Sequence, residues 1–201
     1  MLTRRALLAS PLLALPAAAA GASTPAGDGD DDGLAALPHA WEPVDLSFVR
    51  HAPHSVVNEV VLPASPACVF EVLADPEPWP RWLPLVEGVT YRKPFGKTTV
   101  RDVATLGGTL IREQFFCWDV GERFAFSVVR SSSSVGRHFL EDYLLRPVQG
   151  GATRLIWTCA FAPQDWAAPT GPLLVAAFAA VAPSSLRRLQ LEVKARAARG
   201  T

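Results

Sequence analysis

The chain has 201 residues, of which 49% are hydrophobic, and its 19 basic and 19 acidic side chains balance to a formal net charge of zero. This length and composition suit one domain with a full hydrophobic core. The charge balance gives no basic surface of the kind that binds nucleic acid, so we expect no nucleic-acid partner.

Residues 1–22 have the features of an export signal. Arg4 and Arg5 precede an apolar run from Ala6 to Ala20, and small residues follow that suit cleavage near Ala20–Ala22. The paired arginines favour the twin-arginine route over the general secretory route. The alternative is an uncleaved anchor, but the apolar run is shorter than a membrane-spanning helix requires. No cysteine lies near the cleavage region, so we expect an exported periplasmic or extracellular protein without a lipid anchor.

Residues 23–40 are rich in Gly, Asp, Ala and Pro, and they include the acidic run Gly27–Gly33. Such a segment buries too little apolar surface to offset its chain entropy, so it predicts a disordered linker. A calcium loop of the EF-hand type needs a glutamate at a fixed distance, and that pattern is absent from this run. We therefore place a single folded domain at residues 41–201.

Alternation of apolar residues and the position of turn residues predict an α+β fold in this domain. Two short helices, Pro66–Asp75 and Trp79–Leu83, follow the first strand, and a long helix, Gly171–Ala198, ends the chain. The predicted strands are Ser55–Leu62, Val86–Lys93, Thr98–Leu106, Thr109–Trp118, Glu122–Arg130, Arg137–Val148 and Thr153–Phe161. Consecutive strands with short turns predict an antiparallel meander.

The last predicted helix is apolar on all sides from Pro172 to Ala182. A helix of that kind is usually buried, so we expect a concave sheet to grip this stretch. Pro183 predicts a kink or a new start in the helix. The end of the helix carries Arg187, Arg188, Lys194, Arg196 and Arg199, a cluster that suits either a solvated face or transient contact with anionic lipid.

Several stretches resemble the polyketide cyclase/dehydrase and lipid-transport family, which belongs to the START and birch-pollen-allergen superfamily (SRPBCC). The residues that carry the resemblance are Val69–Pro76 with Trp79 and Trp82, Val100–Leu106 with the Gly107-Gly108 turn and Glu113, Phe139–Leu145 with Pro147, and Gly151–Trp157. The resemblance covers about Ser55 to Ala195. It implies the helix-grip fold, in which a seven-stranded curved antiparallel sheet wraps around a long C-terminal helix. It also implies a cavity for a hydrophobic ligand, in a family that includes both carriers and cyclases.

Strand periodicity indicates which side chains face that cavity. Leu155, Trp157 and Phe161 share one face of the last strand. The neighbouring strand must then present either Phe139, Glu141, Tyr143 and Leu145 or His138, Leu140, Asp142 and Leu144, and we prefer the first set because it is more aromatic. The predicted ligand-binding residues are Phe115, Phe124, Phe126, Phe139, Tyr143, Leu155, Trp157 and Phe178.

The same face carries candidate catalytic groups. Glu141 and Glu113 would point inward, where burial raises the pKa of a carboxyl group and suits it to acid/base catalysis, with Tyr143 as a hydrogen-bond donor to a carbonyl. The alternative is that one or both carboxylates form ion pairs with Arg101, Arg112 or Arg137. His51 and His54 have no carboxylate or cysteine partner at ligand spacing, so we expect no metal and no cofactor.

Three hypotheses remain open at this level. The first is an exported carrier of a hydrophobic small molecule such as a lipid, quinone or polyketide. The second is a cyclase or dehydratase that uses Glu141, Glu113 and Tyr143. The third is an interaction module that uses an exposed Trp79–Trp82 loop to contact a protein or a membrane, although the same tryptophans would also cover the mouth of a cavity.

Overall fold

The computed structural model describes residues 33–93 and 95–199. The predicted export signal and most of the predicted linker lie outside these residues. The strands are β1 (His39–Ala40), β2 (His54–Leu62), β3 (Val86–Tyr91), β4 (Val100–Thr105), β5 (Thr109–Asp119), β6 (Arg123–Ser131), β7 (Gly136–Val148) and β8 (Ala152–Pro163). The α-helices are α1 (Pro66–Ala74), α2 (Trp79–Trp82) and α3 (Gly171–Arg199), and short 3-10 turns lie at Leu34–Ala36, Phe48–Arg50, Gln149–Gly151 and Asp165–Thr170.

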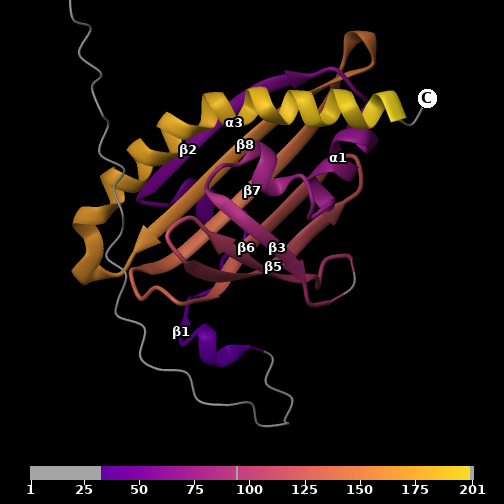
Figure 1. Cartoon of the computed structure of the whole chain (residues 1–201). Helices are drawn as coiled ribbons and strands as arrows, with labels where there is room; N and C mark the ends of the chain where they lie inside the picture. Colours follow the sequence, from indigo (N-terminus) through magenta and orange to yellow (C-terminus); the bar gives the residue numbers. More distant parts are fainter. Residues whose placement is uncertain (1–32, 94, 200–201) are drawn as a thin grey trace, which may run out of the picture.

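Seven strands form one curled antiparallel sheet in the order β2-β8-β7-β6-β5-β4-β3, and α3 lies across it (Figure 1). This architecture confirms the predicted α+β helix-grip fold. Register shifts between β5 and β6 fall at Arg112/Glu113 and Phe115/Cys117, and bulges of this kind bend a strand and increase its twist. Both shifts therefore bend the sheet beside Glu113 and Phe115.

The turn between β4 and β5 follows from its two glycines. Gly107 and Gly108 have φ angles of 89° and 79°, which place both residues in the left-handed region that other residues rarely adopt. Three residues, Leu106, Gly107 and Gly108, join the paired residues Thr105 and Thr109, and the backbone N–H of Gly108 donates to the carbonyl oxygen of Thr105 at 3.0 Å. Three-residue hairpin loops commonly need a residue in the left-handed region. The Gly-Gly pair thus determines both the turn and the register of β4 on β5.

The folded part begins before residue 41, so the predicted boundary of the linker is wrong at this end. Leu34–Ala36 forms a 3-10 turn, and β1 pairs with β6 through His39 and Ala40. Arg130 of β6 also donates a hydrogen bond from Nε to the carbonyl oxygen of Leu37. Two paired residues are too few to produce a periodic pattern, which is why composition alone assigned them to the linker.

The segment after β1 covers the outer face of the sheet. The backbone N–H of Val44 donates to Oγ of Ser127, and Phe48 packs on His138 at 5.3 Å between ring centroids. Leu140 is buried on this side. Asp142 is also buried and pairs with Arg123 at 2.8 Å. The outer face is therefore a second packed layer, and this explains why residues on both faces of β7 are buried.

Helix α1 begins at a capped N-terminus and buries one face. The Ser65 side chain accepts a hydrogen bond from the backbone N–H of Cys68, and Pro66 occupies the first helical turn, where a missing N–H has no cost. The buried residues of α1 are Val69, Phe70, Val72 and Leu73. Trp79 and Trp82 of α2 are buried beside them, which contradicts an exposed tryptophan loop as an interaction surface.

Helix α3 is continuous through Pro183, without the predicted new start. Its second half is gripped by the sheet and by α1 and α2, with Leu189 and Val193 completely buried. The first half is different: Leu173 is 52% exposed, and most of the residues from Pro172 to Ala180 are exposed or half-buried. The prediction that Pro172–Ala182 is buried is therefore wrong. After Gly171, the next buried residue of α3 is Ala182, so the sheet covers the helix later than its composition suggested.

Candidate functional site

A row of polar side chains crosses the concave face of the sheet. Strand pairing aligns Tyr91 with Arg101 and Arg101 with Glu113. Two strands further along, Glu141 of β7 pairs with Phe126 of β6 on one side and with Cys159 of β8 on the other. Side chains at paired positions share a face of the sheet, so these groups lie side by side inside the curl. We call Tyr91, Arg101, Glu113 and Glu141 the polar row.

Arg101 and Glu113 form a buried ion pair. Nε of Arg101 lies 2.5 Å from Oε2 of Glu113, and both side chains are almost completely buried. The guanidinium also lies 4.1 Å from the ring centroid of Trp79 and 4.6 Å from that of Phe126, close enough for cation–π attraction. The sequence left open whether Glu113 was free or paired, and the structure pairs it with Arg101. The other two candidate arginines pair elsewhere, Arg112 with Asp102 and Arg137 with Glu42.

Glu141 is buried, and no arginine of the described residues forms an ion pair with it. Its Oε2 accepts hydrogen bonds from the hydroxyl of Tyr143 and from Nε1 of Trp157. Burial, together with the charge of Glu113, raises the pKa of Glu141 to about 7, although the hydrogen bond from Tyr143 and the charge of Arg101 act in the opposite direction. A carboxyl group of this kind changes its protonation state near neutral pH and can move a proton. The preferred inward set of β7 is therefore the one that the structure shows.

Donors without a well-oriented acceptor lie in the polar row and in α2. Nη1 of Arg101, the hydroxyl of Tyr91 and Nε1 of Trp82 are buried and have no hydrogen-bond partner of good geometry among the described residues. Burial raises the pKa of Tyr91, and the nearby Arg101 guanidinium acts in the opposite direction. Buried donors of this kind are costly unless they are satisfied, and they suit contact with an oxygen atom of a ligand.

Aromatic rings fill the space next to the polar row. Tyr143 stacks on Trp157 with 5.7 Å between ring centroids, and Trp79 and Trp82 from α2 pack against Tyr143 at 6.0 and 6.5 Å. The predicted ligand-binding residues Phe115, Phe124, Phe126, Leu155 and Trp157 are all buried. They face inward as expected, but they belong to a packed core in this conformation and do not line an open space.

The predicted ligand-binding residues Phe139 and Phe178 lie at the accessible end of the concave face. Both are half-buried, and their ring centroids are 5.9 Å apart. Phe178 comes from the uncovered first half of α3, and Phe139 precedes Glu141 by two residues on the same face of β7. A molecule that inserts between these two rings would meet Glu141 before it met Tyr143.

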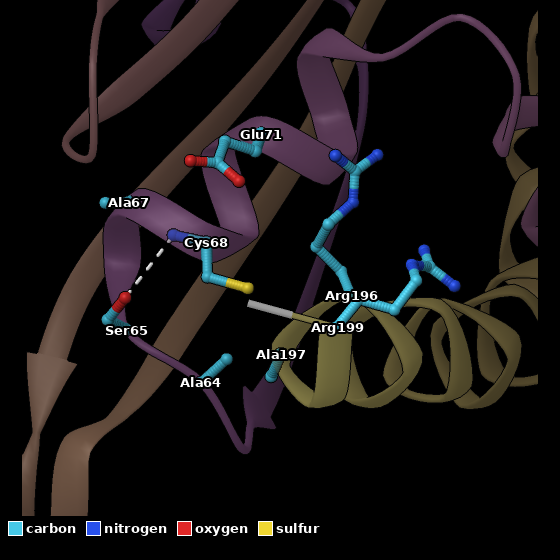
Figure 2. A pocket seen from close by; sticks show the side chains of 8 residues that line it. All are labelled: Ala64, Ser65, Ala67, Cys68, Glu71, Arg196, Ala197 and Arg199. Carbon is cyan, nitrogen blue, oxygen red and sulfur yellow. Dashed lines mark hydrogen bonds between the residues drawn. The ribbon is translucent and has the colours of Figure 1, made fainter. Parts of the chain in front are cut away.

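Two surface pockets lie outside this row. One, of about 570 Å³, opens between the start of α1 and the end of α3 and is lined by Cys68, Glu71, Arg196 and Arg199 among others (Figure 2). Arg196 also forms an ion pair with Asp75 at its edge. The other, of about 420 Å³, has a lining that includes Phe48, His54, Arg137, His138 and Asp165.

Within residues 33–93 and 95–199, no group of three or more His, Cys, Asp or Glu side chains is placed to hold a metal ion. The three cysteines are free. Cys117 and Cys159 are buried, whereas Cys68 is half-buried in the wall of the pocket at α1.

Comparison with known proteins identifies the family. The sequence profile of the polyketide cyclase/dehydrase and lipid transport family matches residues 53–194. The chain belongs to this family. An uncharacterized protein of Mycobacterium tuberculosis (strain H37Rv) is 41% identical over 135 residues, which are 66% of this chain and 78% of that protein. An uncharacterized protein of Mycobacterium bovis matches to the same extent.

Solved structures share the fold of this family member. The Zhui aromatase/cyclase from Streptomyces sp. R1128 superimposes with a TM-score of 0.60 at 18% identity, over 71% of this chain and 94% of that one. A START superfamily protein from Mycobacterium smegmatis gives a TM-score of 0.54 at 16% identity, over 74% and 99%. At these identities the likeness shows the fold. Family and fold together support binding of a hydrophobic ligand or cyclase-like chemistry.

Sequence reasoning missed two parts of the site. Tyr91 and Trp79 were not assigned to it, yet Tyr91 aligns with Arg101 and Trp79 covers the guanidinium. Alternation in β3 indicates that Tyr91 shares a face with Val89, but strand pairing decides which side chains lie beside it, and a single sequence does not reveal the pairing.

Proposed function

We infer that this protein binds a hydrophobic small molecule against the concave face of its sheet, and that the polar row contacts the ligand's polar group. One observation carries the proposal: Glu141, with its pKa near neutrality, is buried two residues beyond the half-buried Phe139 on the same face of β7. Apolar burial would supply most of the affinity, and the donors of Arg101 and Tyr91 would orient an oxygen atom of the ligand.

Entry requires side chains to move, because aromatic rings fill the inner part of the concave face. Phe178 is the natural gate, since it is half-buried and lies on the uncovered first half of α3. Trp79 is held more firmly, because it donates a hydrogen bond from Nε1 to the carbonyl oxygen of Leu73 at 2.9 Å. The ligand would therefore enter beside Phe178 and displace rings from that end.

Native mass spectrometry of the full chain after detergent-free purification tests the binding role. We expect an adduct that can be extracted and identified as a lipid, quinone or polyketide. Phe139→Ala should reduce the adduct at least several-fold, since it removes one ring of the entry pair. Val57→Ala is the matched control, because Val57 is 61% exposed on the outer face of β2. Failure to find any adduct, or equal loss in both variants, would refute this proposal.

An enzymatic role is the second candidate, and the hydrogen-bonded Glu141–Tyr143 pair favours it. A carboxyl group with a pKa of about 7 serves as either acid or base at neutral pH, and Tyr143 could donate to a carbonyl oxygen. If the extracted compound is converted by the wild-type chain, Glu141→Gln should retain binding but reduce the rate of conversion by ~10²-fold or more. A carrier would show binding without conversion.

Export is a separate part of the proposal. The arginine pair and apolar run of residues 1–22 support it. Cell fractionation and amino-terminal sequencing of the purified protein test it: a chain that starts near Ala22 in the exported fraction is the expected result, and an intact cytosolic chain would contradict it.

A further inference from the structure

The outer face of α3 combines exposed apolar residues with exposed positive charge. Leu173, Ala180, Arg187 and Leu191 are spaced seven or four residues apart and therefore share one face of the helix, and all four are exposed. Leu191 is 64% exposed, and Trp166, in the 3-10 turn that leads into α3, is 68% exposed. Figure 1 shows α3 along one side of the sheet.

Its positive charge is not neutralised within the described residues. Arg187, Arg188 and Lys194 are exposed, and none of them has an ion-pair partner among residues 33–93 and 95–199. Glu192, the acidic residue of this helix, is engaged by Arg81 at 2.8 Å. The outer face is thus apolar toward the start of α3 and cationic toward its end.

We propose that the outer face of α3 docks on an anionic lipid surface. A helix with apolar residues and Lys or Arg on its exposed face lies in the interface of a bilayer, and each basic residue adds attraction to anionic headgroups. Arginine and lysine side chains can keep their charged ends at the phosphates while their aliphatic stems follow the apolar surface. A bilayer offers both of the environments that this face requires.

The helix lies on the membrane and does not cross it. The helical stretch Asp165–Arg199 is long and apolar enough to span a bilayer by length and composition, and only 17% of its most apolar window is buried. However, Leu186, Leu189 and Val193 hold the second half in the core. Insertion across the bilayer would remove these residues from the sheet, whereas docking of the outer face leaves them in place.

A second copy of the chain is a poorer occupant. If two outer faces paired side by side in the same direction, Arg187 and Arg188 would face the same residues of the partner. If they paired in opposite directions, the arginines would lie against the partner's apolar half. Either arrangement places positive charge in an interface without a counter-charge, which is costly.

Co-sedimentation of the full chain with two kinds of vesicle tests the proposal, one made of phosphatidylcholine and one that also contains phosphatidylglycerol. Arg187→Gln/Arg188→Gln should weaken binding to the anionic vesicles by roughly 30-fold, the effect of two basic residues near an anionic surface. It should leave the weak binding to phosphatidylcholine unchanged. Leu173→Gln should weaken binding to both kinds by about 10-fold.

Matched controls lie on the outer face of the sheet. Arg146→Gln/Arg154→Gln removes the same charge from exposed positions, and Val57→Gln replaces a comparably exposed apolar residue. All variants share residues 1–22, so any membrane affinity of that segment is a constant background. Equal binding by the α3 variants and their controls would overturn the proposal. Self-association that Leu173→Gln abolishes, without vesicle binding, would also overturn it and assign the face to a second copy.

Discussion

The protonation of Glu141 should make the stability of the fold depend on pH between pH 5 and pH 8. The carboxyl has a pKa of about 7 in the folded chain, against an ordinary value of 4.5. A group whose pKa is higher in the folded state stabilises the fold when it is protonated. That stabilisation is complete below the unfolded-state pKa and is lost as the pH rises through about 7.

The magnitude follows from these two values. At pH 5 the folded chain binds the Glu141 proton almost fully and the unfolded chain only in part, so linkage contributes about 2.5 kcal/mol to stability. At pH 8 both states are ionised, and the contribution is close to zero. Replacement of Glu141 by glutamine removes this contribution. The free energy of unfolding of Glu141→Gln, relative to that of the wild type, should therefore rise by about 2.5 kcal/mol from pH 5 to pH 8.

Urea unfolding of both chains at several pH values measures the difference directly. Glu59→Gln is the matched control: Glu59 is exposed and pairs with Arg154 at the surface, so its substitution should leave the pH dependence of the wild type unchanged. A pH dependence that is the same in Glu141→Gln and in the wild type would refute the raised pKa. An opposite sign, with the wild type gaining stability toward pH 8, would show that Glu141 is stabilised as a carboxylate.

Two further predictions concern the buried ion pair and α3. Arg101→Met and Glu113→Gln should each lower the free energy of unfolding by about 3–5 kcal/mol, as measured with denaturant. The double variant should lose less than the sum of the two single losses, and additive losses would contradict the ion pair. Leu189→Ala should cost about 2–5 kcal/mol, whereas Leu173→Ala should change thermal stability by less than about 0.5 kcal/mol. Equal costs would mean that the first half of α3 is packed.

The alternation of apolar residues was sufficient to orient β6, where the inward residues Phe124 and Phe126 follow a period of two. In β7 alternation left two inward sets open, and its aromatic residues favoured the set with Tyr143, which is the one that the structure shows. The sequence also brought Glu113 and Glu141 to the concave face. It left the partner of Glu113 open, because Arg101, Arg112 and Arg137 all lie within reach in sequence and only the register of β4 on β5 selects Arg101.

The open cavity was the weaker part of the prediction. Inward aromatic residues line a cavity or fill a core with the same periodicity, so the pattern does not distinguish the two. The deciding residues are Trp79 and Trp82, which the structure inserts against Tyr143. Their position depends on how α2 packs on the sheet, a long-range contact that the local sequence does not specify.

Helix α3 shows what composition determines and what it does not. The apolar composition of Pro172–Ala182 predicts surroundings that exclude water. Within this stretch, the fold buries only Ala182. The sequence was therefore informative about the environment that this stretch requires, but not about which molecule supplies it. Because the same face continues into Arg187 and Arg188, an environment that is apolar in one part and negatively charged in the next fits the whole face, and an anionic lipid surface has both properties.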